Sequence, residues 1–220
     1  MFDISSTIRE IAVLAVPLLA ALTLHELAHG FVAYKLGDPT AKRAGRLTLN
    51  PLKHLDPIGT VVFFLIKIGW AKPVPVDPRY FKNPRAGMAL VSIAGPGANF
   101  ILAAIFAAGF HLINSTTVSD PEGMALKVLV PLLLICQAGV LVNLILGVFN
   151  LLPVPPLDGS GIVQYFLPQR LAYQYERFGR YGIFVILGLF ILGDILGFSV
   201  LGTFLFPPVR FGAALLGVPL

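Results

Sequence analysis

Long apolar stretches separated by polar segments organise this chain. Apolar residues dominate positions 11 to 34, 86 to 112, 126 to 152 and 181 to 206. Each stretch reaches the length of about 20 residues that a helix needs to cross the hydrocarbon core of a bilayer. The pattern predicts an all-α polytopic membrane protein with about four transmembrane helices. The glycines from Gly193 to Gly197 mark a point where the last of these helices can break.

A further apolar segment, from Pro57 to Trp70, has a different character. Its apolar core from Ile58 to Leu65 is too short to span a bilayer and too apolar for a water-facing loop. The segment is therefore predicted to be a short re-entrant or β-hairpin membrane segment. The β-branched and aromatic run from Thr60 to Phe64 favours a strand over a helix.

The composition supports a membrane protein and excludes several other classes. Hydrophobic residues make up 56% of the 220 positions and charged residues 12%, and the mean hydropathy is +0.84. Soluble chains carry about 25% charged residues, so a cytosolic enzyme, a disordered chain and a free nucleic-acid binder are excluded. The lipid bilayer is the expected partner, and no nucleic acid is expected. The one cysteine, Cys136, rules out an internal disulfide and a cysteine metal cage.

The few charges are distributed unevenly and predict an orientation. The connection from residue 35 to 85 and the link from 168 to 180 are rich in lysine and arginine, whereas the loop from 113 to 123 carries acidic residues. Basic loops of membrane proteins face the cytoplasm. We expect a multi-pass protein of the cell membrane, with an external N-terminus and with the ends of the first and third spans near the cytoplasmic surface.

The first apolar stretch contains a pattern typical of zinc enzymes. His25-Glu26-Leu27-Ala28-His29 is an HExxH sequence, which on a helix places both imidazoles one turn apart on one face. They can share a zinc ion while Glu26 lies beside the water that the metal activates. The alternative is a pair of buried structural histidines, but ionisable groups inside a span are costly and usually functional.

A catalytic zinc site needs a third protein ligand. Asp158 is the best candidate, because it follows the third span at the predicted cytoplasmic end, where the first helix also ends. His25 lies about 14 Å before the end of its helix near Tyr34, at 1.5 Å per residue, so the metal would lie below the surface. The alternative role of Asp158 is to cap a short helix after the turn Pro156-Leu157-Asp158-Gly159.

Three motifs together resemble a known family. They are His25 to His29, Ala94-Gly95-Pro96-Gly97-Ala98-Asn99, and the stretch from Phe149 to Gly159. Over about residues 11 to 165 the chain is similar to the site-2 protease family of intramembrane zinc metalloproteases (peptidase M50). The resemblance implies that His25, His29 and Asp158 bind Zn²⁺ and that Glu26 is the catalytic base. It also implies that Asn150 contacts the substrate backbone.

Two further stretches, residues 54 to 60 and 69 to 74, resemble the compact prokaryotic branch of that family, so a bacterial or archaeal source is expected. No segment between the spans is long enough for the PDZ domain that many relatives carry. We expect a single integral membrane protease domain over residues 1 to 220, with a catalytic core at about 11 to 165 and a C-terminal helical segment at about 181 to 206.

The expected reaction is hydrolysis of a transmembrane protein substrate near the cytoplasmic face. The substrate has to become extended, and the strand-like run from residue 60 to 65 is expected to offer an edge for pairing. Asn143 and Asn150 lie on one helix face and can offer amides to the substrate, or else join the helices by hydrogen bonds. His54 is a further candidate for substrate binding or gating, with a solvated loop histidine as the alternative.

Other hypotheses stay open at this stage. A membrane metal-ion transporter would also use buried histidine and aspartate residues, but it would need ligands across the whole bilayer. The sequence does not decide whether the protein forms a homo-oligomer, what the physiological substrate is, or which roles Asp194 and His111 have.

Overall fold

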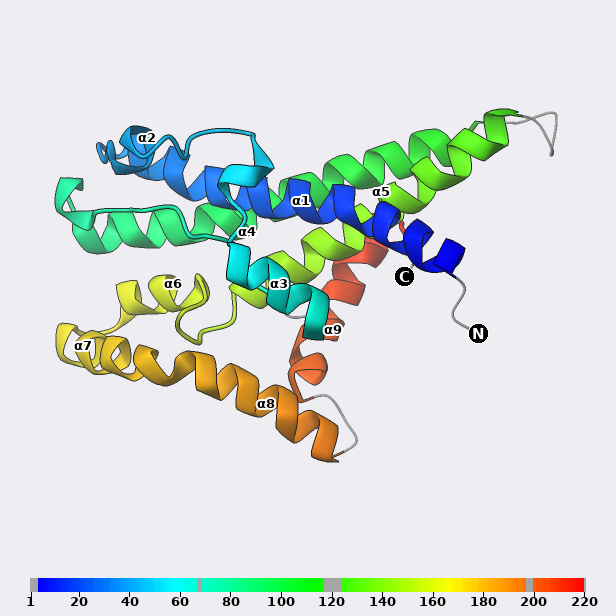
Figure 1. The fold of residues 1–220 in the computed structure, drawn as a ribbon. Coiled ribbons are helices and arrows are strands. Elements are labelled where there is room, and N and C mark those ends of the chain that lie inside the picture. Colours follow the sequence, from blue (N-terminus) through cyan, green and yellow to red (C-terminus); the bar gives the residue numbers. More distant parts are fainter. Residues whose placement is uncertain (1–3, 67–68, 117–123, 197–199, 220) are drawn as a thin grey trace.

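Long antiparallel helices form the body of the molecule (Figure 1). The computed structural model describes residues 4–66, 69–116, 124–196 and 200–219. The three longest helices are α1 (Ile4–Lys35), α4 (Pro84–Asn114) and α5 (Met124–Asn150). The other helical elements are α2 (Thr40–Arg43), η1 (Pro51–Lys53), α3 (Pro57–Ile66), η2 (Pro78–Tyr80), α6 (Gly159–Phe166), α7 (Gln169–Phe178), η3 (Gly179–Tyr181), α8 (Gly182–Leu196) and α9 (Val200–Leu215).

The first three predicted spans are confirmed as helices long and apolar enough to cross a membrane. Among the described residues they run from Ile11 to Lys35, from Pro84 to Asn114 and from Ala125 to Asn150. The end of α1, the start of α4 and the end of α5 lie toward the same end of the bundle (Figure 1). The all-α class is also confirmed, since the described part of the chain has no strand and only an isolated bridge between Leu55 and Ala71.

The fourth predicted apolar stretch, residues 181 to 206, contains two helices, and whether they cross the membrane as one span stays a prediction. This region forms two helices, α8 of 15 residues and α9 of 16 residues, which run in different directions (Figure 1). Each is shorter than the roughly 20 residues of a straight span. Helix α8 ends at Leu196, within the glycine-rich point from Gly193 to Gly197 where a break was expected, and glycine is a poor helix former.

The strand expected at residues 60 to 64 is also wrong, because this run lies inside helix α3. Asp56 accounts for the helix start: its side-chain oxygen accepts the Gly59 N–H at 2.7 Å, and its carbonyl accepts the Thr60 hydroxyl at 2.7 Å. Pro57 occupies the first helical position, which favours proline. Local capping therefore outweighs the β-propensity of the run. A helix offers no strand edge, so substrate pairing at this run is excluded, and whether α3 re-enters the membrane stays a prediction.

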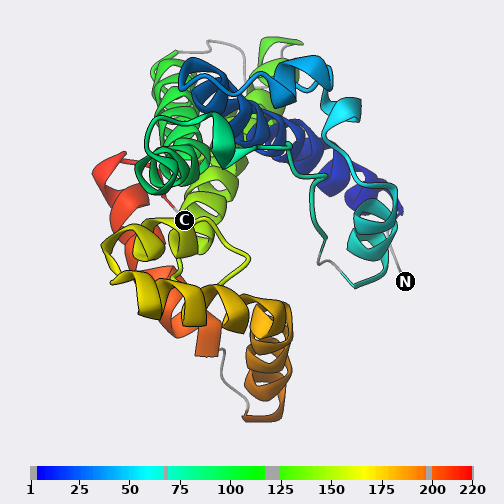
Figure 2. The same cartoon turned by 90° about the vertical axis from the view of Figure 1, so that its left-hand side faces the viewer.

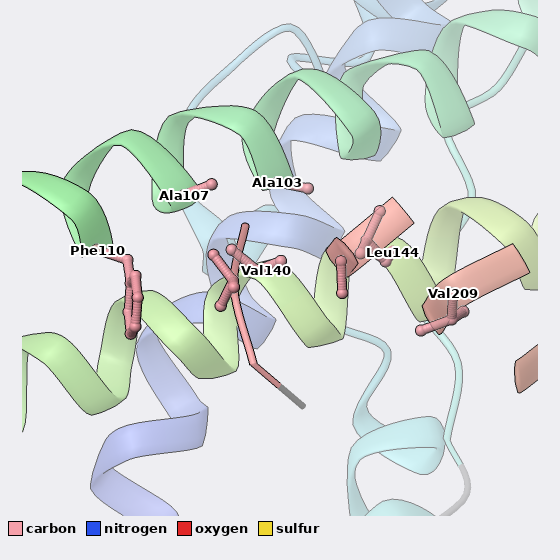
Figure 3. Close-up of a cluster of buried hydrophobic side chains, with 8 residues drawn as sticks. Ala103, Ala107, Phe110, Val140, Leu144 and Val209 are labelled. Carbon is pink, nitrogen blue, oxygen red and sulfur yellow. The ribbon is translucent and has the colours of Figure 1, made fainter. Parts of the chain in front are cut away.

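The core lies where α9 packs against α4 and α5 (Figure 3). Its buried members are Ala103, Ala107, Phe110, Val140, Leu144, Val209, Ala213 and Val218. Small residues let the helices approach closely, which is how helices associate in lipid. Gly139 shows this most clearly, because a Cβ atom there would lie 2.4 Å from the ring of Phe106. The core thus fixes α4 against α5 and holds the C-terminal helix on them.

Figure 2 looks along the bundle from the end where α1 finishes. Helices α6 and α7 lie on one side of the bundle, and α8 extends away from it. The chain between α5 and α6 brings Asp158 back toward α1, which creates the site described next.

Candidate metal centre

Two histidines on α1 form one side of the centre. His25 and His29 are buried, with 8% and 9% of their surface exposed. Their positions, four residues apart, place them on one helix face. The two Nε2 atoms lie 3.0 Å apart, and the ring planes are nearly perpendicular at 84°. The predicted histidine pair is therefore assembled inside the first predicted span.

Asp158 completes the centre from a different part of the chain. Its Oδ2 atom lies 3.1 Å from Nε2 of His25 and 3.3 Å from Nε2 of His29. The chain turns sharply here, and a Cβ atom on Gly159 would lie 2.2 Å from the carbonyl oxygen of Leu151, so glycine is required for this approach. Asp158 stands at the start of α6, but its side chain makes no capping hydrogen bond. The capping alternative is thus not what the side chain does.

The outer nitrogens of both imidazoles are held by hydrogen bonds. Nδ1 of His29 lies 2.7 Å from the carbonyl oxygen of Val91, and a carbonyl only accepts, so Nδ1 carries the proton. Nδ1 of His25 lies 2.7 Å from Oδ1 of Asn99. A neutral histidine has one N–H, so both Nε2 atoms present lone pairs toward Asp158.

A pair of asparagines fixes the tautomer of His25. The side-chain NH₂ of Asn99 donates to Oδ1 of Asn143 at 3.0 Å and to the carbonyl of Ala21 at 3.3 Å. The NH₂ of Asn143 donates in turn to the carbonyl of Gly139 at 2.8 Å. With both NH₂ groups committed as donors, Oδ1 of Asn99 is the atom that accepts from His25. This relay through buried amides orients the imidazole of His25 in the way that outer-shell partners orient metal ligands.

Three acceptor atoms therefore converge with no hydrogen to share. His25, His29 and Asp158 each offer one ligand atom, and all three atoms lie within 4.8 Å of one another. Oδ2 of Asp158 is buried and has no hydrogen-bond partner among the described residues. An aspartate side chain is a carboxylate at neutral pH, because its ordinary pKa is about 3.9. Lone pairs this close repel one another unless a positive charge lies among them.

The donor set fits zinc. Two imidazole nitrogens and one carboxylate oxygen are the ligands of many catalytic zinc sites, which keep a fourth position open. Calcium and magnesium prefer oxygen ligands throughout, so this mixture disfavours them. The buried acceptors and the fixed tautomers thus point to a transition-metal ion of this kind.

Gly95 on α4 makes room for the centre. A Cβ atom at this position would lie 2.4 Å from Nε2 of His29 and 2.7 Å from Cε1 of His25. Both Gly95 and Pro96 lie within the continuous helix α4. The glycine lets α4 lie directly against the two imidazoles.

Glu26 lies next to His25 in the chain and is partly buried. Its Oε2 atom accepts the backbone N–H of Val74 at 2.8 Å. Sequence analysis did not predict this contact, because a backbone donor 48 residues away leaves no pattern of residue types. The roles of Asn99 and Gly95 could have been found, since a polar amide and a glycine inside an apolar span each require an explanation.

The three candidates for substrate binding, Asn143, Asn150 and His54, differ in their burial and in their hydrogen bonds. Asn143 is fully buried within the relay, which matches the alternative that it joins helices. Asn150 is half-buried and donates to the carbonyl of Leu146 at 3.0 Å, and its substrate role stays a prediction. His54 is 1% exposed and its Nε2 donates to the carbonyl of Thr48 at 2.9 Å, so it is not a solvated loop histidine. A substrate role for His54 also stays a prediction.

His111 and Asp194, whose roles the sequence left open, belong to helices α4 and α8. His111, near the far end of α4, donates from Nε2 to the carbonyl of Leu216 at 2.7 Å and so helps to hold the C-terminal segment. The side chain of Asp194 lies outside the part of the chain whose side chains are described.

Comparisons with known proteins identify the family. The profile of Peptidase family M50 matches residues 125–193, a region that includes Asp158. The chain is 46% identical over 178 residues to "Putative zinc metalloprotease YwhC" of Bacillus subtilis, covering 81% of this chain and 80% of that relative. No solved structure matches.

More distant relatives are longer than this chain. "Putative zinc metalloprotease Rip2" of Mycolicibacterium smegmatis is 30% identical over 79% of this chain and 64% of its own length. "Zinc metalloprotease MJ0392" of Methanocaldococcus jannaschii is 30% identical over 74% of this chain and 36% of its own length. Together with the apolar helices and the metal centre, these matches show that the chain belongs to peptidase family M50, the site-2 protease family, and is a membrane zinc metalloprotease.

Proposed function

We propose that this metalloprotease hydrolyses peptide bonds of transmembrane or membrane-associated proteins near the cytoplasmic face of the cell membrane. The observation that carries the proposal is the convergence of two imidazole nitrogens and one carboxylate oxygen, all within 4.8 Å, beside a predicted span. Polar groups at such a depth are costly in lipid and are kept for function. A metal centre in this place can act on a peptide bond that lies below the membrane surface.

Each residue of the centre has a distinct role in this proposal. His25, His29 and Asp158 would hold the zinc ion and leave its fourth position open. Zinc, when bound, supplies a Lewis acid that polarises a carbonyl and makes water more acidic. The Glu26 carboxylate accepts the proton of the attacking water and later delivers it to the leaving amine. The Val74 N–H holds one carboxylate oxygen, so the other remains for this proton transfer.

The cytoplasmic placement rests on the distribution of charge and on depth. His25 lies ten residues before the end of α1 at Lys35, which corresponds to about 15 Å along the helix. Helices at this end of the bundle carry basic residues: Lys35 ends α1, Lys42 and Arg43 lie in α2, Arg85 lies at the start of α4, and Arg170 and Arg177 lie in α7. By the positive-inside rule this end faces the cytoplasm. The active site would thus be reached from that side.

The substrate must present an extended backbone, because a peptide bond inside a helix is shielded by its own hydrogen bonds and side chains. Asn150 ends α5, eight residues before the metal ligand Asp158. Its NH₂ group is held by Leu146, and its Oδ1 has no hydrogen bond to any described residue. This oxygen can therefore accept a substrate N–H, which supports the role that the family resemblance implies.

The test replaces Glu26 with Gln, and Glu176 with Gln as a matched control. Glu176 is an exposed carboxylate on α7, outside the centre. Both variants and the wild type are reconstituted in liposomes with a single-span model substrate. Zinc per chain, substrate cleavage and zinc flux across the vesicle are measured. We expect Glu26→Gln to retain zinc and to lose cleavage by several orders of magnitude, while Glu176→Gln behaves as the wild type.

Two results would contradict the proposal. Cleavage by Glu26→Gln at the wild-type rate would remove Glu26 from the mechanism. Zinc flux without cleavage in the wild type would favour the transporter alternative. That alternative would need ligands along the whole membrane path, whereas among the described residues the three convergent ligands lie at one depth.

A further inference from the structure

An extended segment crosses α1 beside the catalytic glutamate. We call residues 72 to 77, with the sequence Lys-Pro-Val-Pro-Val-Asp, the strap. The segment has no helix or strand, and its conformation is set locally, because each proline fixes its own φ angle and restricts the residue before it to extended backbone. Pro73, Pro75 and Pro78 act on Lys72, Val74 and Asp77 in this way. The strap is therefore stiff before it makes any contact.

The strap meets α1 at Glu26 and one turn further on, at Gly30. The Val74 N–H donates to Oε2 of Glu26 at 2.8 Å. A Cβ atom on Gly30 would lie 2.9 Å from Cγ1 of Val74, so glycine at this position lets the strap lie against the helix. Val74 is only 9% exposed. Because Pro73 and Pro75 have no N–H, Val74 is the only donor that this part of the strap backbone can offer to the carboxylate.

Both ends of the strap are anchored by buried side chains. Arg46, 7% exposed, donates from its guanidinium to the carbonyl of Lys72. At the other end, the Asp77 N–H donates to Oδ2 of Asp38 at 2.7 Å, and Asp38 is fully buried. A buried charge is expensive unless hydrogen bonds compensate it, so these two charges are retained at a cost. Neither contacts the metal ligands.

We propose that the strap positions the catalytic base, and that Asp38 and Arg46 are positioning residues which act through it. The proposal rests on the proposed function, in which Glu26 is the base. The N–H of Val74 forms a charge-assisted hydrogen bond that fixes the side chain of Glu26 in one orientation. Asp38 and Arg46 keep that N–H in place by holding the strap at both ends.

The proposal makes a specific prediction for the two prolines that can be introduced into the strap. Val74→Pro removes the N–H that contacts Glu26. Val76→Pro introduces the same residue two positions later, where the N–H makes no hydrogen bond with any described residue. We expect kcat to fall about 10- to 100-fold for Val74→Pro, the range typical for the loss of an outer-shell partner. The factor by which kcat falls should be at least ten times smaller for Val76→Pro. KM and zinc content should stay within about twofold of the wild type for both, since among the described residues the strap has no hydrogen bond or ion pair with a proposed zinc ligand.

Substitutions of the two anchoring residues, Arg46 and Asp38, provide an independent test of the proposal. Arg46→Ala should lower kcat in the same manner, and Arg46→Lys should restore part of it, because one N–H donor is enough to reach the Lys72 carbonyl. Asp38→Asn should also lower kcat, because the amide replaces one of the two acceptor oxygens with a donor. Thermal unfolding is measured for each variant, so that loss of fold is separated from loss of positioning.

The outcomes separate the two proposals. Glu26→Gln is measured in parallel: if it cleaves, the proposed function fails. If Glu26→Gln is inactive but Val74→Pro cleaves with wild-type kcat, the strap proposal alone is overturned. A rise in KM with unchanged kcat for Val74→Pro would also overturn it, because the strap would then contact the substrate rather than position the base.

Discussion

Replacing Gly95 with alanine tests the geometry of the metal centre most sharply. A Cβ atom at this position would lie 2.4 Å from Nε2 of His29, whereas ordinary contacts begin at 3.4 Å. The imidazole or the helix must therefore move by about 1 Å. Errors of this size in a reacting site cost about 100-fold. Because the same nitrogen is a proposed zinc ligand, zinc affinity should fall roughly 10- to 100-fold, or about 1.4 to 2.7 kcal/mol.

Gly97 provides the matched control. It lies two residues further along the same helix, and a Cβ atom there would meet nothing within 4 Å. Gly97→Ala should bind zinc as the wild type does and unfold at a slightly higher temperature, since alanine favours a helix over glycine by about 1 kcal/mol. Zinc affinity is measured by competition with a chromogenic chelator in detergent, and substrate cleavage is measured on the same samples.

The comparison has a clear refuting result. If Gly95→Ala binds zinc as tightly as the wild type does, then α4 does not lie against the imidazoles at the distances described. If both alanines weaken zinc equally, the effect comes from the helix and not from the contact with the histidines.

Three further outcomes are expected. Asn99→Ala should weaken zinc binding about 10- to 100-fold, because it removes the acceptor that orients the imidazole of His25. Asn143→Ala should weaken zinc binding about tenfold or less, because Asn143 contacts Asn99 and not the imidazole. The same chelator competition measures both affinities. Gly139→Ala should destabilise the bundle by about 1 to 3 kcal/mol, because its Cβ would overlap the ring of Phe106, while Gly188→Ala, with nothing within 4 Å, should not; reversible unfolding in detergent measures the difference. Removing zinc with a chelator should lower the thermal midpoint of the wild type, and adding zinc back should restore it, because an ion that binds only the native state stabilises it.

The convergence of His25, His29 and Asp158 could be predicted because each of these residues breaks a local rule. Histidines and a glutamate inside an apolar stretch are costly in lipid, and their spacing fits one helix face. Asp158 followed from the need for a third ligand at the same depth. The three long helices were predicted for a related reason, since their length and hydropathy exceed what a soluble protein would tolerate.

Other features depend on contacts that composition does not record. The run at residues 60 to 64 has strand-forming residues, but the cap at Asp56 makes it helical. The apolar region after residue 181 contains two helices, α8 and α9, and hydropathy alone does not tell where the first one ends. The bond from the Val74 N–H to Glu26 joins positions 48 residues apart through a backbone atom. Only the folded arrangement reveals such pairs.

X-ray absorption at the zinc edge tests the central claim most directly. Purified wild-type protein with one zinc per chain should show a first shell of nitrogen and oxygen at about 2.0 to 2.2 Å, with the outer-shell signature of two imidazoles and with no sulfur. In Asp158→Ala the shell should lose one oxygen ligand of the protein and zinc should be released at lower chelator concentration. A sulfur ligand at about 2.3 Å, or a spectrum and a zinc affinity that are unchanged in Asp158→Ala, would contradict the assignment of the centre.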